Sequence, residues 1–181
     1  MNPLNYYIPL LERPYRPCVG LMVFNKNGEV FCGQRIDNKA EAWQLPQGGI
    51  DEGETPLEAG FRELKEETSM VNVEYVCEYP DWINYDIPLP LADTLWDAKY
   101  RGQVQRWLLF YFTGKNSEIN INTRQPEFKR WEWIKPDELP LRAISFKKEV
   151  YVQITRMFIP ILNNFNASEL TERYAQWKEK I

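Results

Sequence analysis

Three glutamates in one short segment have a spacing that lets them act together. Glu63, Glu66 and Glu67 are three and four residues apart, so on a helix their side chains fall within an arc of about 100°. Such carboxylates repel one another by a few tenths of a kcal/mol per pair, and the dipole near a helix end disfavours anions. A hard divalent cation would use these oxygen ligands, whereas the same segment, taken alone, also fits an ordinary solvated helix face.

The residues just before these glutamates favour the metal interpretation. Segment 43–54 contains Gly48, Gly49 and Gly53 together with Pro46, and this composition predicts mostly loop. A glycine-rich loop that leads into a helix can place backbone carbonyls and amides around a metal-bound polyphosphate. A solvated surface helix does not require such a loop. The two features together predict a site for a metal ion and phosphates.

The composition excludes several other kinds of chemistry. The chain has no histidine, which removes Ser-His-Asp catalysis, Cys-His catalysis and HExxH zinc sites. Cys18, Cys32 and Cys77 are far apart and form no C-x-x-C pair, so neither a disulfide framework nor a thiolate zinc site is encoded. We therefore expect a reducing, cytoplasmic setting. The net charge of -4 lacks the basic excess typical of proteins that bind duplex DNA, so no duplex DNA partner is expected.

Length and hydrophobic patterning predict one compact domain that holds this site. The chain has 181 residues, 44% of them hydrophobic, which suits a single globular core. The longest apolar run, Trp107 to Phe112, is far shorter than the roughly 20 residues that span a bilayer. Met1 to Leu10 also lacks a basic region leading into an apolar run. We expect no membrane partner and no secretory signal.

The expected elements alternate between strands and helices. Thr55 is a plausible N-cap, Pro56 suits the first helical position and Glu58 completes a capping box, so this helix should run to about Thr68. A second helix should be capped by Ser145 and bent or ended at Pro160. A last amphipathic helix should follow Ser168. Strands are expected over residues 19–24, 30–33, 71–76, 107–112 and 131–134, with a turn over 25–28 and a long aromatic-rich connection over 79–105. This pattern predicts an α/β (α+β) fold in which a mixed sheet is sandwiched between helices.

The carboxylate segment and its glycine loop resemble a known family signature. The matching residues are Gly48-x5-Glu54-x7-Arg62-Glu63-Leu64-x-Glu66-Glu67-x-Ser69-Met70. They resemble the box of the Nudix hydrolases, G-x5-E-x7-R-E-U-x-E-E-x-G-U, in which U is bulky and apolar. Only Ser69 departs from it. Ser69 replaces a helix-ending glycine, which should strain the helix end by about 1 kcal/mol without removing a ligand.

Further segments narrow the resemblance to bacterial RNA pyrophosphohydrolases and the similar dinucleoside polyphosphate (diadenosine tetraphosphate) hydrolases. These segments are 15–20, 43–49, 102–107, 126–133 and 145–151. The resemblance implies the Nudix fold over residues 14–160, with an N-terminal lead-in over 1–13 and a C-terminal helical extension over 161–181. It also implies a divalent metal cofactor, with Mg²⁺ favoured over Mn²⁺.

The resemblance also assigns roles to individual residues. It implies metal ligands at Glu63, Glu66, Glu67 and Glu127 and at the backbone carbonyl of Gly48. Glu54 and Arg62 would orient the carboxylates. The catalytic base varies among Nudix enzymes; without histidine it must be a carboxylate or a metal hydroxide, and we favour Glu66. Arg16, Arg35 and Lys147 match positions near the phosphates, and Phe146 matches an aromatic that contacts a base, although it also fits the core stripe of its own helix.

Three functions remain open at this point. The first is removal of pyrophosphate from 5′-triphosphate RNA to leave a 5′-monophosphate, which promotes RNA decay. The second is hydrolysis of a dinucleoside polyphosphate, for example diadenosine tetraphosphate to ATP and AMP. The third is a catalytically silent Nudix-fold binding module, which the complete set of glutamates argues against. The expected partner is therefore an RNA 5′ end or a dinucleoside polyphosphate, and the sequence does not tell which protein partners the chain has.

Overall fold

The computed structural model describes residues 9–36 and 42–166, and within them one mixed sheet of eight strands lies between helices. The helix expected after Ser168 lies outside the described residues. The strands are β1 (Tyr15–Phe24), β2 (Val30–Arg35), β3 (Trp43–Gln44), β4 (Gln47–Gly49), β5 (Val73–Glu78), β6 (Ile83–Asp86), β7 (Gly102–Phe112) and β8 (Phe128–Ile134). The α-helices are α1 (Pro56–Thr68), α2 (Leu89–Ala92), α3 (Leu139–Arg142) and α4 (Lys148–Asn163). Short 3₁₀ turns cover Leu10–Glu12, Trp96–Ala98, Asn116–Glu118, Pro136–Glu138 and Ser145–Lys147.

The centre of the sheet is the parallel pair β1 and β7. Tyr15 lies opposite Gly102 and the register continues without a break to Phe24 and Tyr111. The main strand order is β3-β2-β1-β7-β5, with β4 also pairing with β1, β6 with β7, and β8 with β2. All these other pairs are antiparallel. The predicted mixed sheet is confirmed.

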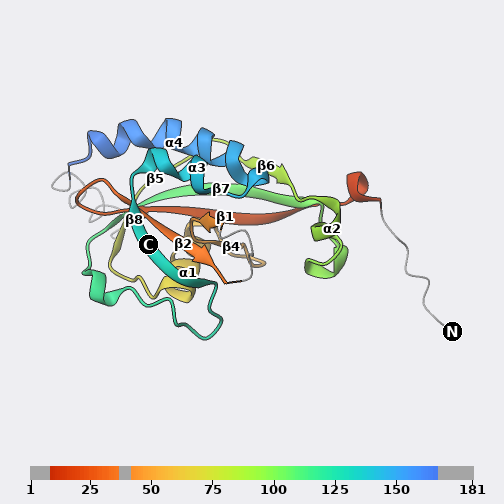
Figure 1. Ribbon diagram of the computed structural model, residues 1–181, viewed down its shortest axis with the longest axis horizontal. Helices are drawn as coiled ribbons and strands as arrows, with labels where there is room; N and C mark the ends of the chain where they lie inside the picture. Colours follow the sequence, from red (N-terminus) through yellow and green to blue (C-terminus); the bar gives the residue numbers. More distant parts are fainter. Residues whose placement is uncertain (1–8, 37–41, 167–181) are drawn as a thin grey trace.

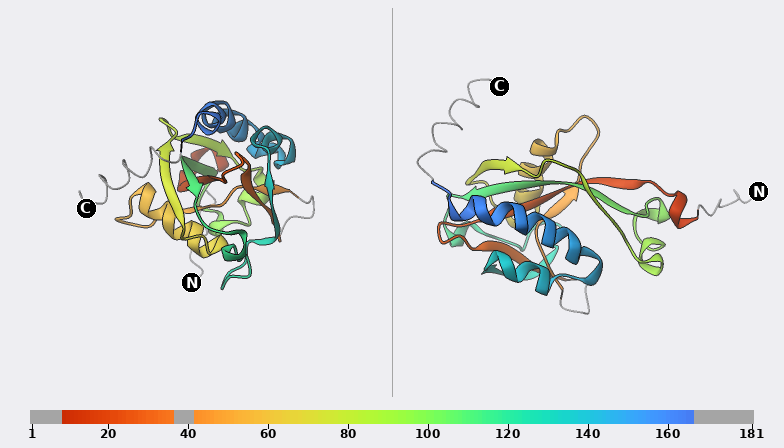
Figure 2. Two further views of the ribbon diagram at one scale, coloured as in Figure 1. Left: turned by 90° about the vertical axis from the view of Figure 1, so that its left-hand side faces the viewer. Right: turned by 90° about the horizontal axis from the view of Figure 1, so that it is seen from above.

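Alternation along the two central strands gives each face of the sheet its own core. On β7, Leu108 and Phe110 pack on the side of α1, whereas Trp107 and Leu109 pack on the side of α4. α1 and α4 accordingly cover opposite faces, as Figures 1 and 2 show. The sandwich predicted from the alternating elements is therefore confirmed.

Within the described residues, no helix has the length and apolar character needed to cross a bilayer.

Several boundaries differ from those expected. The expected loop over 43–54 contains β3 and β4, and the connection over 79–105 contains β6 and α2. These short strands form because they pair with β1, β2 and β7. The sequence did not predict them, because no local pattern reveals such pairing. Ser145 is not the cap of α4: it begins a 3₁₀ turn, and Lys147 occupies the N-cap position. Pro160 lies in the last turn of α4, which continues to Asn163, so the division predicted at residue 160 falls inside this helix.

Candidate active site

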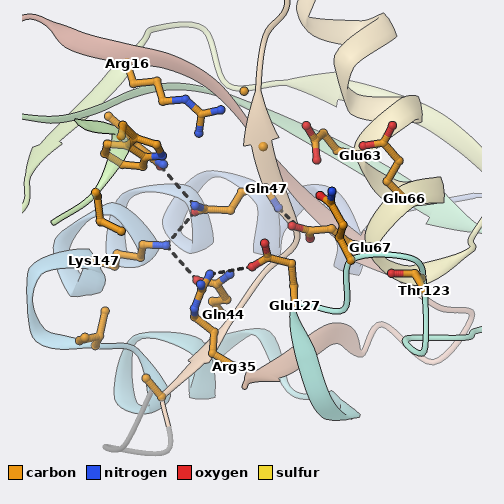
Figure 3. Close-up of a pocket in the computed structure, with 18 of the residues that line it drawn as sticks. Arg16, Arg35, Gln44, Gln47, Glu63, Glu66, Glu67, Thr123, Glu127 and Lys147 are labelled. Atoms are coloured by element: carbon orange, nitrogen blue, oxygen red, sulfur yellow. Dashed lines mark hydrogen bonds and ion pairs between the residues drawn. The ribbon is translucent and has the colours of Figure 1, made fainter. Parts of the chain in front are cut away.

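A cleft of about 1320 Å³ opens beside α1 and β4 (Figure 3). The sequence-predicted residues that line it are Arg16, Arg35, Gly48, Arg62, Glu63, Glu66, Glu67, Glu127, Phe146 and Lys147. They come from both ends of the chain, and the fold brings them to one place. Glu54 is not part of the lining, but its carboxylate accepts a hydrogen bond from Arg62, which is. Figure 3 shows the carboxylates on one side of the cleft and Arg16 and Lys147 on the other.

The start and end of α1 place its glutamates at the cleft. Thr55 Oγ1 accepts from the Glu58 N–H at 3.3 Å and Glu58 Oε2 accepts from the Thr55 N–H at 2.8 Å, so the predicted capping box is confirmed. At the other end Ser69 takes the left-handed conformation, with φ 60°, that glycine adopts more easily. Its hydroxyl donates to the Asn120 carbonyl at 3.0 Å, which offsets part of the conformational cost.

Arg62 is the centre of the hydrogen bonds that orient the carboxylates. Its guanidinium donates twice to Glu54, at 2.8 Å each, and once to Glu63 at 2.6 Å. It also donates to the Gly49 carbonyl at 2.8 Å and to Glu66 at 3.4 Å. The hydrogen bonds from Arg62 hold the pKa of Glu54 below its usual range. The planar guanidinium of Arg62 therefore links α1 to the glycine loop and orients the carboxylates of Glu54 and Glu63.

Glu67 is buried, unlike its neighbour Glu66 on α1. The residue is only 5% exposed, whereas the Glu66 side chain is 59% exposed. Glu67 Oε2 accepts from the Gln47 backbone N–H of β4 at 3.2 Å. Burial raises the pKa of Glu67 well above its ordinary value, and the charges of Glu127 and Glu63 raise it further. The burial of Glu67 thus accompanies its contact with β4, a strand that the sequence did not reveal.

Gly48 leaves room for the carboxylate of Glu63. A β-carbon at position 48 would overlap the Glu63 carboxylate, so any side chain there would displace it. The Glu63 side chain is 12% exposed, and burial raises its pKa despite the hydrogen bond from Arg62. The Gly48 backbone and the Glu63 carboxylate are thus in direct contact, as a shared ligand role requires.

Glu127 reaches the same cleft from the segment before β8. Its carboxylate pairs with Arg35 at 3.0 Å, and its charge contributes to the raised pKa of Glu67. Across residues 9–36 and 42–166, no three acidic or cysteine side chains converge closely enough to hold a metal ion as they stand. Arg62 and Arg35 instead bind several of these carboxylates. The donor set nevertheless fits a hard cation, because it consists of oxygens and includes a buried carboxylate beside like charges.

The opposite side of the cleft is cationic and aromatic. Lys147 is buried and donates to the side-chain carbonyls of Gln44 at 2.9 Å and Gln47 at 2.8 Å. Burial, followed by the charge of Arg35, lowers the pKa of Lys147 to about 7. The Phe146 ring stacks on Tyr85 with centroids 5.9 Å apart and an interplanar angle of 23°. Cationic and aromatic groups therefore lie side by side, as recognition of a nucleotide requires.

Some residues of the cleft were missed from the sequence. The guanidinium of Arg16 lies over the ring of Trp96, 5.3 Å from its centroid, and Trp96 lies in a turn that the sequence did not predict. Gln103 and Gln105 are buried on β7 and bond to the cleft residues. Their spacing of two on a strand was a signal for polar groups on one face. The position of Trp96 had no comparable local signal.

Comparison with known proteins agrees with the fold. The profile of the family described as NUDIX domain matches residues 14–154. A Cereibacter sphaeroides protein named RNA pyrophosphohydrolase is 47% identical over 84% of this chain and 95% of its own length. A Roseobacter denitrificans protein of the same name is 50% identical over 80% of this chain and 92% of its own length. A C. elegans Ap4A hydrolase structure superimposes with a TM-score of 0.58 at 17% identity, covering 79% of this chain and 97% of that one, which supports the fold alone.

Proposed function

This chain belongs to the NUDIX domain family and is a hydrolase of that family, and we propose that it removes pyrophosphate from 5′-triphosphate RNA. The products are a 5′-monophosphate end, which exposes the transcript to decay, and free pyrophosphate. The observation that carries the proposal is one cleft with buried carboxylates on one side and Lys147 with Arg16 on the other. The RNA pyrophosphohydrolases that are about half identical to this chain support the choice of RNA as substrate.

The family uses divalent metal ions, and we propose Mg²⁺, with Mn²⁺ as the alternative. The residues that would hold the metal are Glu63, Glu66, Glu67, Glu127 and the Gly48 carbonyl. The like charges of Glu63 and Glu127 around the buried Glu67 support this assignment, because a cation at this point would relieve their repulsion. A divalent cation bound by these residues would neutralise the polyphosphate and would lower the pKa of the attacking water. Arg62, which is itself bonded to Glu54, orients the carboxylate of Glu63.

Phosphate binding falls to the basic residues of the cleft. Arg16 lies between the Trp96 ring and the backbone of Gly49, and any side chain at Gly49 would overlap its guanidinium. Lys147 and Arg35 provide charge on the floor of the cleft. We propose that these three cations hold the triphosphate while its α–β anhydride bond breaks. The negative charge that develops on the leaving pyrophosphate is then stabilised by fixed donors.

We propose that Glu66 accepts the proton of the attacking water. The Glu66 side chain is 59% exposed and therefore open to solvent, whereas Glu67 is buried and accepts a hydrogen bond from the Gln47 N–H. A general base must lie within reach of the water that it deprotonates. The water oxygen bonds to the α-phosphorus and the bond from this atom to the α–β bridging oxygen breaks. The pyrophosphate departs with that oxygen.

We propose that Phe146 contacts a nucleobase at the 5′ end of the RNA. Its stacked arrangement with Tyr85 at the cleft supports this role, while its packing against the core supports a structural one as well. Stacking contributes roughly 1–3 kcal/mol per base, so Phe146→Ala should lower kcat/KM for triphosphate RNA about tenfold or more. Phe165→Ala is the matched control, since Phe165 packs on Phe24 outside this cleft. Normal processing of RNA by Phe146→Ala would assign this ring to the core alone.

The proposed function is tested by measuring kcat/KM in parallel for 5′-triphosphate RNA and diadenosine tetraphosphate with Mg²⁺. We expect the RNA to be the better substrate. Rapid cleavage of diadenosine tetraphosphate with no action on the RNA would replace the RNA assignment by the dinucleotide one. Cleavage of neither substrate, with the RNA bound, would indicate a silent binding module.

A further inference from the structure

Gln103 of β7 lines the cleft and Gln105 lies two residues further along the same strand, and the mechanism above uses neither of them. Gln103 is 4% exposed and Gln105 is 1% exposed. They are two residues apart on one strand, so both side chains lie on the same face of the sheet. Polar side chains buried this deeply are costly unless their hydrogen bonds are satisfied. Their partners therefore show what the two residues do.

The side-chain carbonyl of Gln103 is shared by three donors. It accepts from the Tyr85 hydroxyl at 2.7 Å, from Gln105 Nε2 at 2.9 Å and from Gln47 Nε2 at 3.2 Å. With three donors around one oxygen, Gln103 Oε1 has no lone pair left for a substrate. Through this oxygen, Gln103 can therefore affect the reaction only by way of the groups that it holds.

The arrangement around Gln103 also determines which way Gln47 points. Because Gln47 donates its Nε2 to Gln103, its Oε1 must face the other way, where it accepts from Gln105 at 3.0 Å and from Lys147 at 2.8 Å. An ammonium group has donors only, so this carbonyl is the atom that Lys147 requires. The orientation of one amide thus links Gln103 to the lysine on the phosphate side.

The same oxygen of Gln103 holds the aromatic side of the cleft. The hydroxyl that it accepts belongs to Tyr85, whose ring stacks on Phe146. Lys147 Nζ also lies 5.7 Å from the centre of the Tyr85 ring. Gln103 therefore contacts, directly or through Gln47, both the aromatic pair and the buried cation.

We propose that Gln103 is a positioning residue that couples the base-binding pair, Tyr85 and Phe146, to the phosphate-binding Lys147. This inference rests on the proposed function, because it takes the cleft to bind an RNA 5′-triphosphate end. Through this network the base and the phosphates are held at a constant separation, which selects a nucleotide 5′ end over a bare polyphosphate. Networks of this kind are cooperative, so loss of one member weakens the others.

The metal side of the cleft does not depend on Gln103. The backbone of Gln47 is held by β1, where Gly20 is its partner, and its N–H donates to Glu67. Loss of the Gln103 side chain would release the Gln47 amide but leave its backbone in the sheet. Gln103→Leu should therefore weaken RNA binding and leave the binding of a metal ion nearly unchanged. A residue that merely supports the fold would not separate these two quantities.

The test compares Gln103→Leu with wild type in two binding measurements. The Kd of a short 5′-triphosphate RNA, measured in Ca²⁺ to slow turnover, should rise about tenfold. The Kd of Mn²⁺ alone, followed by electron paramagnetic resonance, should stay within about twofold. Gln34→Leu is the matched control: Gln34 is also a buried strand glutamine, and it accepts from Arg130 away from the cleft lining. Its RNA affinity should match that of wild type.

A double-mutant cycle identifies the shared hydrogen bond. Tyr85→Phe removes the hydroxyl and keeps the ring, so it should raise the RNA Kd about threefold alone and not at all in the Gln103→Leu background. Additive effects, an unchanged RNA Kd in Gln103→Leu, or loss of Mn²⁺ affinity in parallel would overturn the inference. Wild-type protein that binds the RNA without cleaving it would refute the proposed function instead, and the binding comparison would still decide the role of Gln103.

Discussion

Replacement of Arg62 by lysine tests the orientation of the carboxylates most sharply. Lysine keeps the positive charge but presents one ammonium group in place of a planar fork with five donors. It cannot reproduce both hydrogen bonds to Glu54 together with those to Glu63 and the Gly49 carbonyl. We therefore expect the variant to lose stability and activity together, although its net charge is unchanged.

The magnitude follows from the burial of this group. The side chains of Arg62, Glu54 and Glu63 are 27%, 15% and 12% exposed, so these bonds are only partly screened by water. A hydrogen bond to a charged group contributes about 1.5–3 kcal/mol, and lysine can replace some of those lost. A net loss of about 2 kcal/mol would lower the melting temperature by about 4–8 °C in a chain of this size. Displacement of Glu63 should lower kcat/KM by about 10- to 100-fold.

Calorimetry and steady-state kinetics on two variants provide the assay. Arg142→Lys is the matched control, because Arg142 lies outside the cleft lining and also bonds two carboxylates, Glu132 at 2.9 Å and Glu138 at 2.7 Å. The side chains of these two carboxylates are 43% and 38% exposed, far more than those of Glu54 and Glu63. Exposed pairs contribute at most about 1 kcal/mol, so this control should lose little stability and no activity. Equal losses in the two variants, or full activity in Arg62→Lys, would refute the role assigned to Arg62.

Three further changes have defined outcomes. Glu67→Gln should abolish most turnover yet raise the melting temperature of metal-free protein, because it removes a buried charge that lies beside like charges; a lower melting temperature in chelator would contradict this. Gly48→Ala should lower kcat at least about tenfold with an unchanged circular dichroism spectrum, because its β-carbon overlaps the Glu63 carboxylate, and normal kinetics would count against it. The pKa of Lys147 is about 7 in the folded protein and near 10.5 in the unfolded chain. Between these two pH values the unfolded chain binds more protons at this residue, so the free energy of unfolding should rise with pH across this window. Lys147→Met should flatten that rise in calorimetric scans, and an unchanged slope would contradict the burial of its charge.

The sequence predicted best what depends on residues close together in the chain. The start of α1 was predicted to the residue because its capping box is closed by side chains three positions apart, at Thr55 and Glu58. The left-handed conformation at Ser69 was implied by the family signature, in which a glycine ends the helix at this position. Both features are local, so no knowledge of the sheet was needed.

Features that depend on distant pairing were missed. The burial of Glu67 requires β4, and β4 forms only because it pairs with β1 nearly thirty residues earlier. β6 was expected as loop because its partner, β7, begins beyond a long connection. The hydrogen bond between Gln47 and Gln103 was missed for the same reason, since these residues meet only after β1 has paired with both β4 and β7. Periodicity shows which face of a strand is polar, but it does not show what that face meets.

The central claim is that this cleft uses a divalent cation to release pyrophosphate from RNA 5′ ends. The most direct test is to incubate the protein with RNA that carries a labelled γ-phosphate and to identify the labelled product. We predict labelled pyrophosphate and 5′-monophosphate RNA with Mg²⁺, and neither product after chelation or with Glu67→Gln. Labelled orthophosphate with 5′-diphosphate RNA, or undiminished release after chelation, would contradict the account.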